Sequence, residues 1–92
     1  MNIDDFAAEL QNRFPLFLSY TVKYTRQKER GLCSFDGTII EITIKPKMPH
    51  SITKETMIHE WAHARLICAA YTHDEAWGRE YSRIYQQLIG DV

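Results

Sequence analysis

The stretch MIHEWAHARLICAA, residues 57–70, decides how this chain is expected to fold. It is apolar nearly all round, and a helix of this kind packs against neighbours on more than one side. Within it, His59 and His63 lie four positions apart, and Glu60 follows the first histidine directly. Residues i and i+4 of a helix share one face, so both imidazoles can reach a single metal ion. We therefore predict a buried helix that carries a metal site.

The HExxH pattern suits zinc chemistry. Two imidazoles one turn apart match the bite of tetrahedral Zn²⁺, whose bonds to histidine nitrogen are about 2.0 to 2.1 Å long. Glu60 is a neighbour rather than a ligand, and it is expected beside a zinc-bound water as the general base for attack on a peptide carbonyl. The residues predict a zinc-dependent metallopeptidase, most simply an endopeptidase, with one Zn²⁺ per chain. Alternatively, the histidines only pack on an apolar helix.

A catalytic zinc commonly has three protein ligands and one open position, so a third donor is needed. His73 precedes Trp77 by four residues and Tyr81 by eight, which places it on the inward stripe of the last predicted helix. His73 is therefore the preferred third ligand. Glu80, seven residues further on and near the same face, is its main rival as the alternative third ligand, and Glu75 points off the stripe.

A further polar group is expected to stabilise the oxyanion of the transition state. Tyr81, Tyr85, Arg79 and His50 are within reach of the predicted site. Tyr81 is the best placed of them on the inward stripe, although a tyrosine in such a position is more often part of the core.

The remaining patterns predict an α+β domain with a small sheet packed against helices. Helical spacing marks residues 3–14, alternation marks a strand over 18–25, and Asp36-Gly37 favours a tight hairpin between two strands. Ile40, Ile42 and Ile44 are expected to face the core, and Glu41, Thr43 and Lys45 to face water. Ser51 or Thr53 is the expected N-cap of the metal helix, and the last helix spans about 74–89. A fourth strand could come from 46–52.

Length and composition restrict the function classes. The 92 residues form one predicted domain, residues 1–92, with 45% apolar residues, 25% charged residues and a net charge of -1. This composition gives no global attraction to nucleic acid or membrane. No signal peptide or membrane span is recognisable, so a cytoplasmic monomer acting on a protein or peptide is expected. Cys33 and Cys68 lack paired spacing and are expected to be small buried thiols.

Basic residues are concentrated in the central part of the chain. They are Lys23, Arg26, Lys28, Arg30, Lys45 and Lys47. They could contact nucleic-acid phosphates, but a solvated edge that discourages strand pairing is the preferred interpretation.

The segments HEWAH (59–63) and HDEAWGREYSRIY (73–85), with the isoleucine-rich strand before them, resemble the SprT-like (Spartan-related) zinc metallopeptidases, particularly small stand-alone members from phages and bacteria. The resemblance covers roughly residues 30 to 90. It implies a zincin-like minimal domain in which His59, His63 and His73 bind zinc and Glu60 is the catalytic acid and base.

The chain departs from that family in two respects. The gap between His63 and His73 is shorter than in larger Spartan-like proteins, and the appended zinc-binding and DNA-binding segments are missing, so cleavage of DNA-crosslinked proteins is not implied. Very small latent gluzincins would use a glutamate as third ligand, which keeps Glu80 and Glu75 as alternatives. A second hypothesis retains fold and zinc without proteolysis: a zinc-stabilised, non-catalytic or latent binding module.

Overall fold

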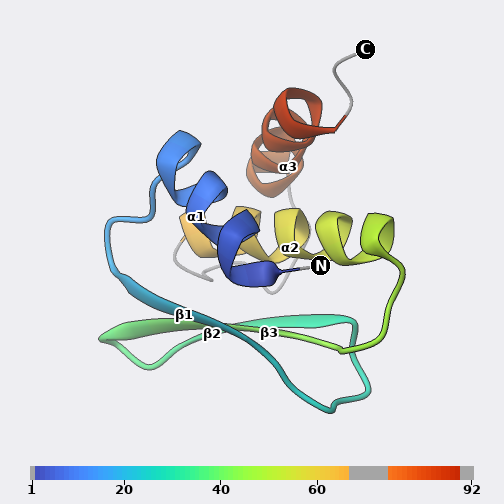
Figure 1. Cartoon of the computed structure of the whole chain (residues 1–92). Coiled ribbons are helices and arrows are strands. Elements are labelled where there is room, and N and C mark those ends of the chain that lie inside the picture. Colours follow the sequence, from blue (N-terminus) through green and yellow to red (C-terminus); the bar gives the residue numbers. More distant parts are fainter. Residues whose placement is uncertain (1, 67–74, 90–92) are drawn as a thin grey trace.

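The computed structural model describes residues 2–66 and 75–89, and within them the chain is an α+β domain, as predicted. Its helices and strands, in chain order, are α1 (Ile3–Arg13), β1 (Ser19–Tyr24), β2 (Gly31–Phe35), β3 (Ile39–Ile44), α2 (His50–Arg65) and α3 (Glu75–Leu88). Helices α1 and α2 lie on one face of the sheet, and α3 packs on the side of α2 away from the sheet (Figure 1). Helix α2 is therefore the middle layer.

Helix α1 closes the core through the stripe that the sequence predicted. The residues of this stripe are all buried: Ile3, Phe6, Ala7 and Leu10 in the helix, and Phe14 directly after it. The side chain of Asn2 caps the helix by accepting hydrogen bonds from the backbone nitrogens of Asp4 and Asp5, at 2.9 and 3.3 Å. These contacts satisfy two of the amide groups that a helix start leaves without intrahelical partners.

The described sheet has three strands in the order β1-β3-β2, and β3 is central. The predicted hairpin is present as the antiparallel pair β2 and β3, while β1 runs parallel to β3. Ile40, Ile42 and Ile44 are at most 1% exposed, which confirms the predicted core face. No fourth strand occurs in the described part of the chain, because residues 46–49 form no strand and α2 begins at His50.

Thr43 corrects one detail of that alternation. It was expected to face water but is only 7% exposed. Its two cross-strand neighbours are Lys23 and Leu32, so the central strand is covered from both sides. The side chain of Gln27 also crosses this position and donates a hydrogen bond to the Thr43 carbonyl at 3.4 Å. An outward-facing residue on a central strand is buried where long side chains flank it.

The bounds of α2 also differ from the prediction. The helix begins after Pro49, before the expected caps at Ser51 and Thr53, and it ends at Arg65. Pro49 suits this position because its fixed φ is compatible with a helix start, and its carbonyl accepts the amide of Thr53 at 2.9 Å. The predicted start lies too late because Ser51 and Thr53 have side chains that can cap a helix, whereas Pro49 makes no side-chain cap hydrogen bond. The predicted continuation over 67–70 lies outside the described residues.

Arg65, the last residue of α2, links the end of the helix to two other parts of the domain. The guanidinium group of Arg65 donates to the carbonyl of Pro15 at 2.7 Å and is paired with Glu80 of α3. One side chain thus joins the loop after α1, the end of α2 and the middle of α3. Glu80 is only 18% exposed, and its second partner is Arg83 at 2.9 Å.

Two observations bear on the setting of the domain. In the described residues, no helix is both long and apolar enough to cross a membrane. Cys33 on β2 is disulfide-bonded, so the expectation of a free thiol there is wrong. Sequence spacing could not reveal this, because cysteines far apart in a chain can still be neighbours in its fold. Cys68 lies outside the described residues.

Candidate metal centre

Helix α2 brings the three residues of the predicted motif together. One ligand atom each of His59, Glu60 and His63 lies within 4.8 Å of the others. The imidazole centroids of the two histidines are 5.0 Å apart, with 64° between the ring planes. Two imidazole nitrogens with a neighbouring carboxylate are a donor set that suits Zn²⁺. The group could hold a metal ion, and this part of the cofactor prediction is confirmed.

Trp61 determines the direction in which these histidines point. Each helical residue turns about 100°, so His59 and His63 both lie about 160° around the helix from Trp61. The Trp61 indole is fully buried, packs edge-on against Tyr20 of β1 at 5.2 Å, and donates a hydrogen bond to the carbonyl of Phe14 at 2.8 Å. Because Trp61 faces the sheet, the two histidines face the side on which α3 packs.

Helix α3 supplies an aromatic wall for both histidines. The Trp77 ring stacks on His63 at 5.3 Å and meets His59 edge-on at 4.8 Å between centroids. Its indole nitrogen also donates to the His59 carbonyl at 3.4 Å. The sequence placed Trp77 on the inward stripe, but its contact with both imidazoles follows only from how α3 packs on α2. This contact restricts the ring orientations of both candidate ligands.

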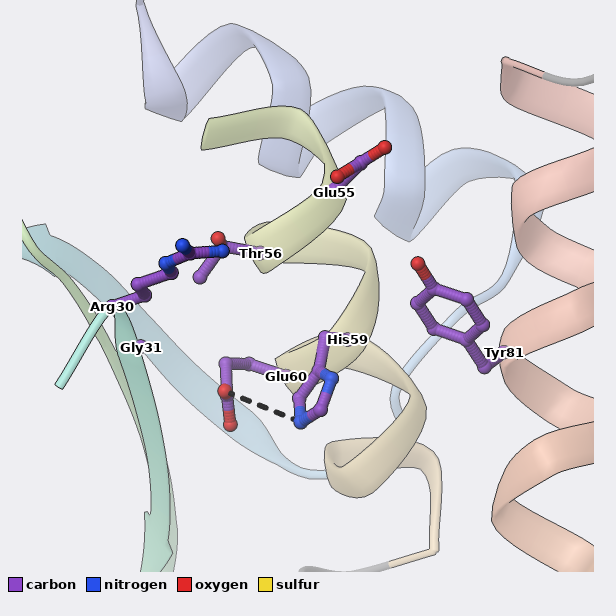
Figure 2. Close-up of a pocket in the computed structure, with 7 residues that line it drawn as sticks. All are labelled: Arg30, Gly31, Glu55, Thr56, His59, Glu60 and Tyr81. Atoms are coloured by element: carbon purple, nitrogen blue, oxygen red, sulfur yellow. Dashed lines mark ion pairs between the residues drawn. The ribbon is translucent and has the colours of Figure 1, made fainter. Parts of the chain in front are cut away.

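The motif borders an open cleft of about 310 Å³. It is lined by Arg30, Gly31, Glu55, Thr56, His59, Glu60 and Tyr81. Figure 2 shows Arg30 and Gly31 at the start of β2 on one side, Tyr81 of α3 on the other, and the α2 residues between them. The sequence predicted three of these seven residues for the site, namely His59, Glu60 and Tyr81.

Glu60 is the most unusual group in the cleft. Its carboxylate lies 3.9 Å from the Nε2 atom of His59, and the residue is only 6% exposed. Burial disfavours the charged form and raises the pKa of Glu60 to about 7. A carboxyl group with this pKa takes up and releases a proton near neutral pH, which is what a general base requires. A cation bound to the histidines would lower this pKa by favouring the carboxylate.

Gly31 allows β2 to approach α2 closely enough to enclose Glu60. A Cβ atom at Gly31 would lie 2.6 Å from Cγ2 of Thr56, 2.9 Å from Cγ of Glu60 and 3.0 Å from its Oε2. Only glycine fits there without displacing these side chains. The sequence showed a glycine at the end of a charged connector but gave no sign that it touches the candidate general base.

Tyr81 is the one predicted oxyanion stabiliser that lines the cleft. Its ring lies between those of Trp77 and Tyr85, at 5.1 and 5.7 Å between centroids, and 6.2 Å from the His59 ring. Burial raises its pKa above the ordinary value of 10.0, with smaller contributions from the charges of Glu55 and Tyr85. The phenol therefore keeps its proton at neutral pH and remains a hydrogen-bond donor.

The other candidates for that role lie elsewhere. Tyr85 donates its hydroxyl to Glu55 at 3.4 Å, and Arg79 pairs with Glu75 at 2.9 Å on the exposed side of α3. His50 is the first residue of α2, more than two turns from His59. None of these three lines the cleft around the motif.

The described residues do not contain the preferred third ligand, because His73 lies outside them. Glu80, the alternative, is paired with Arg65 and Arg83. Glu75 is exposed and paired with Arg79. In the described ranges, neither glutamate joins the group formed by the two histidines and Glu60.

Of the basic residues predicted as a solvated edge, Arg30 alone lines this cleft, and Lys23 pairs with Glu41 at 3.3 Å. Arg26, Lys28, Lys45 and Lys47 are exposed. Contact with nucleic acid stays a prediction. No model of a known protein family matches the chain, and no curated protein is detectably similar to it in sequence.

The contact at Gly31 leads to a stability prediction. Gly31→Ala should lower the free energy of unfolding by about 1 to 3 kcal/mol, because the added methyl group overlaps Thr56 and Glu60. Gly78→Ala is the matched control: nothing lies within 4 Å of its added Cβ in α3, so it should raise stability by about 0.5 to 1 kcal/mol. Urea unfolding of both variants measures this, and a free energy of unfolding that Gly31→Ala leaves unchanged or raises would contradict the proposed contact.

The pKa of Glu60 leads to a prediction about pH. In the metal-free protein this pKa is raised from its ordinary value of 4.5 to about 7, so the stability it contributes is complete below pH 4.5 and is lost as the pH rises through 7. Between pH 4.5 and 8 the wild type should lose about 3 kcal/mol more than Glu60→Gln. Urea unfolding in the presence of a chelator tests this. Parallel pH profiles of the two proteins would show that burial does not perturb Glu60.

Proposed function

We propose that this chain is a zinc-dependent metallopeptidase with a zincin-like fold, similar to the SprT-like enzymes. The observation that carries the proposal is that one ligand atom each of His59, Glu60 and His63 lies within 4.8 Å of the others, and that His59 and Glu60 line an open cleft. In this proposal His59 and His63 bind zinc, and His73 completes the ligand set. The resemblance to the SprT-like family supports the assignment of His73. No DNA dependence is proposed.

Each residue of the site has its own role in the proposed peptide hydrolysis. Zinc, when bound, supplies a Lewis acid that polarises the substrate carbonyl. Glu60 accepts a proton from the attacking water and can return it to the leaving amine, because its carboxylate lines the cleft beside the proposed zinc ligand His59. Tyr81, on the opposite wall, keeps its proton and can donate a hydrogen bond to the oxyanion. Trp77 restricts the orientations of both imidazoles.

The shape of the cleft indicates the kind of substrate. Its volume of about 310 Å³ is near the lower limit of ordinary ligand pockets. It can hold the groups around one peptide bond but not a folded surface. A substrate would therefore enter as a flexible or unfolded segment, and an endopeptidase acting on such segments is the form of activity that we propose.

The assignment of Glu60 as general base predicts a separation of binding from catalysis. Glu60→Gln should retain zinc, because the proposed ligands are His59, His63 and His73, but lose about 10²-fold to 10⁴-fold in kcat/KM, because an amide cannot accept the proton. Zinc content by mass spectrometry and hydrolysis of a quenched fluorescent peptide library measure the two properties. Glu9→Gln, on the exposed side of α1, is the control and should behave as wild type. Full hydrolysis by Glu60→Gln would exclude this role.

The ligand set predicts how zinc content depends on two residues. His73→Ala should lose the single zinc of the wild type, whereas Glu80→Gln should keep it, because Glu80 is paired with Arg65 and Arg83. Circular dichroism checks that each variant is folded, since loss of the Arg65 pair lowers stability.

The opposite pattern of zinc loss would make Glu80 the third ligand. If the wild type binds zinc and melts on chelation but hydrolyses no peptide, it is a zinc-stabilised binding module instead. If the wild type takes up no zinc even when zinc is supplied, the metal hypothesis is wrong.

A further inference from the structure

Glu55 is an acidic residue of the cleft that the proposed mechanism does not use. It precedes His59 by four residues, so the two side chains lie on the same face of α2 with Cβ atoms about 5 to 6 Å apart. Figure 2 shows it one turn along α2 from the His59 and Glu60 pair, on the same side as Tyr81. Glu55 is half-buried in this position.

Glu55 forms no ion pair in the described part of the chain. Its one polar contact there is the hydroxyl of Tyr85 at 3.4 Å, and it takes part in no ion pair with lysine or arginine. The adjacent Lys54 lies over the Phe6 ring of α1, 5.7 Å from its centroid. A carboxylate held in a concave, partly apolar site with no cationic partner creates a negative potential that attracts a cation.

Glu55 also stands where the cleft continues. It lines a second hollow of about 500 Å³ between α2 and α3, together with His50, Ser51, Lys54, Tyr85, Leu88 and Ile89. Because Glu55 is the residue common to both hollows, a chain lying in the cleft and extending along α2 passes its carboxylate. The apolar side chains of Leu88 and Ile89 offer a surface for the methylene groups of a long side chain.

We propose that Glu55 is a specificity-determining residue that selects peptides carrying a lysine or arginine near the bond to be cleaved. The spacing supports this choice, because alternate residues of an extended chain repeat at about 6.6 Å, close to one helical turn. The cationic residue therefore lies about two positions from the scissile bond. This inference rests on the proposed peptidase function.

Arg30 is a cationic residue that lines the same cleft as Glu55. It lines the opposite wall, at the start of β2, and is exposed. A cationic side chain on that side would be repelled, and one beside Glu55 would be attracted. Attraction beside Glu55 and repulsion beside Arg30 distinguish recognition by Glu55 from a general affinity for positive charge.

The test compares two peptides that differ only by lysine or glutamine at one position near the scissile bond, with that position varied along the peptide. The zinc-loaded wild type should favour the lysine peptide by about tenfold in kcat/KM at one position. Glu55→Gln should reduce that ratio to about one, and Glu55→Lys should reverse it. Glu9→Gln is the matched control and should keep the wild-type ratio. Binding of the same peptides to zinc-loaded Glu60→Gln, measured by fluorescence anisotropy, gives a readout that does not depend on hydrolysis.

The outcomes separate the inference from the function on which it rests. Cleavage by the wild type with a lysine ratio that Glu55→Gln leaves unchanged would overturn the role of Glu55 and leave the peptidase intact. Absence of cleavage, together with a lysine preference in binding that disappears in Glu55→Gln, would overturn the peptidase and retain Glu55 as the residue that recognises cations. Absence of both would overturn both.

Discussion

The burial of Trp61 is the constraint on which the arrangement of this domain depends. Its indole lies against Tyr20 of β1 and donates to the carbonyl of Phe14, so it fixes both the depth and the rotation of α2 on the sheet. A helix whose rotation is fixed at one residue has fixed directions at all the others, because each step turns about 100°. The motif histidines are thus directed away from the sheet by a contact in which neither takes part.

The middle position of α2 explains why its polar residues have unusual surroundings. Helix α2 is covered by the sheet on one side and by α3 on the other, so Thr53, Thr56, Glu60 and His63 are all buried. Thr56 satisfies its hydroxyl within the helix by donating to the carbonyl of Ile52 at 2.7 Å. Glu60 has no comparable hydrogen bond in the described residues, and burial instead raises its pKa. Such a destabilised group in a cleft is the feature on which the proposed function of Glu60 rests.

The sequence predicted what depends on local pattern and missed what depends on packing between elements. Helical spacing predicted the buried stripe of α1, and alternation predicted the core face of β3, because burial on one face makes the apolar residues recur at a regular spacing. The parallel pairing of β1 with β3 produces no such spacing, so the sequence did not predict it. The approach of Gly31 to Glu60 and the contact of Trp77 with both imidazoles also join residues far apart in the chain. The HExxH motif is local in the chain and could be recognised in the sequence. The positions of Glu55 and Arg30 in the cleft depend on packing, so only the structure reveals them.

Four of the residues that line the cleft belong to α2, namely Glu55, Thr56, His59 and Glu60, and they form one strip along the helix. The helical repeat gives the strip two sides. Glu55 and His59 share one side of the strip, facing α3, while Thr56 and Glu60 share the other, facing Gly31 of β2. The two carboxylates consequently have different environments. Glu60 is enclosed by the β2 contact and has a pKa near 7, which suits proton transfer. Glu55 lies where two hollows meet, half-buried and accessible to a partner, which suits recognition of charge. The pair Thr56 and Glu60 is offset by one residue from the pair Glu55 and His59, and this offset is enough to place one carboxylate against β2 and the other where the two hollows meet.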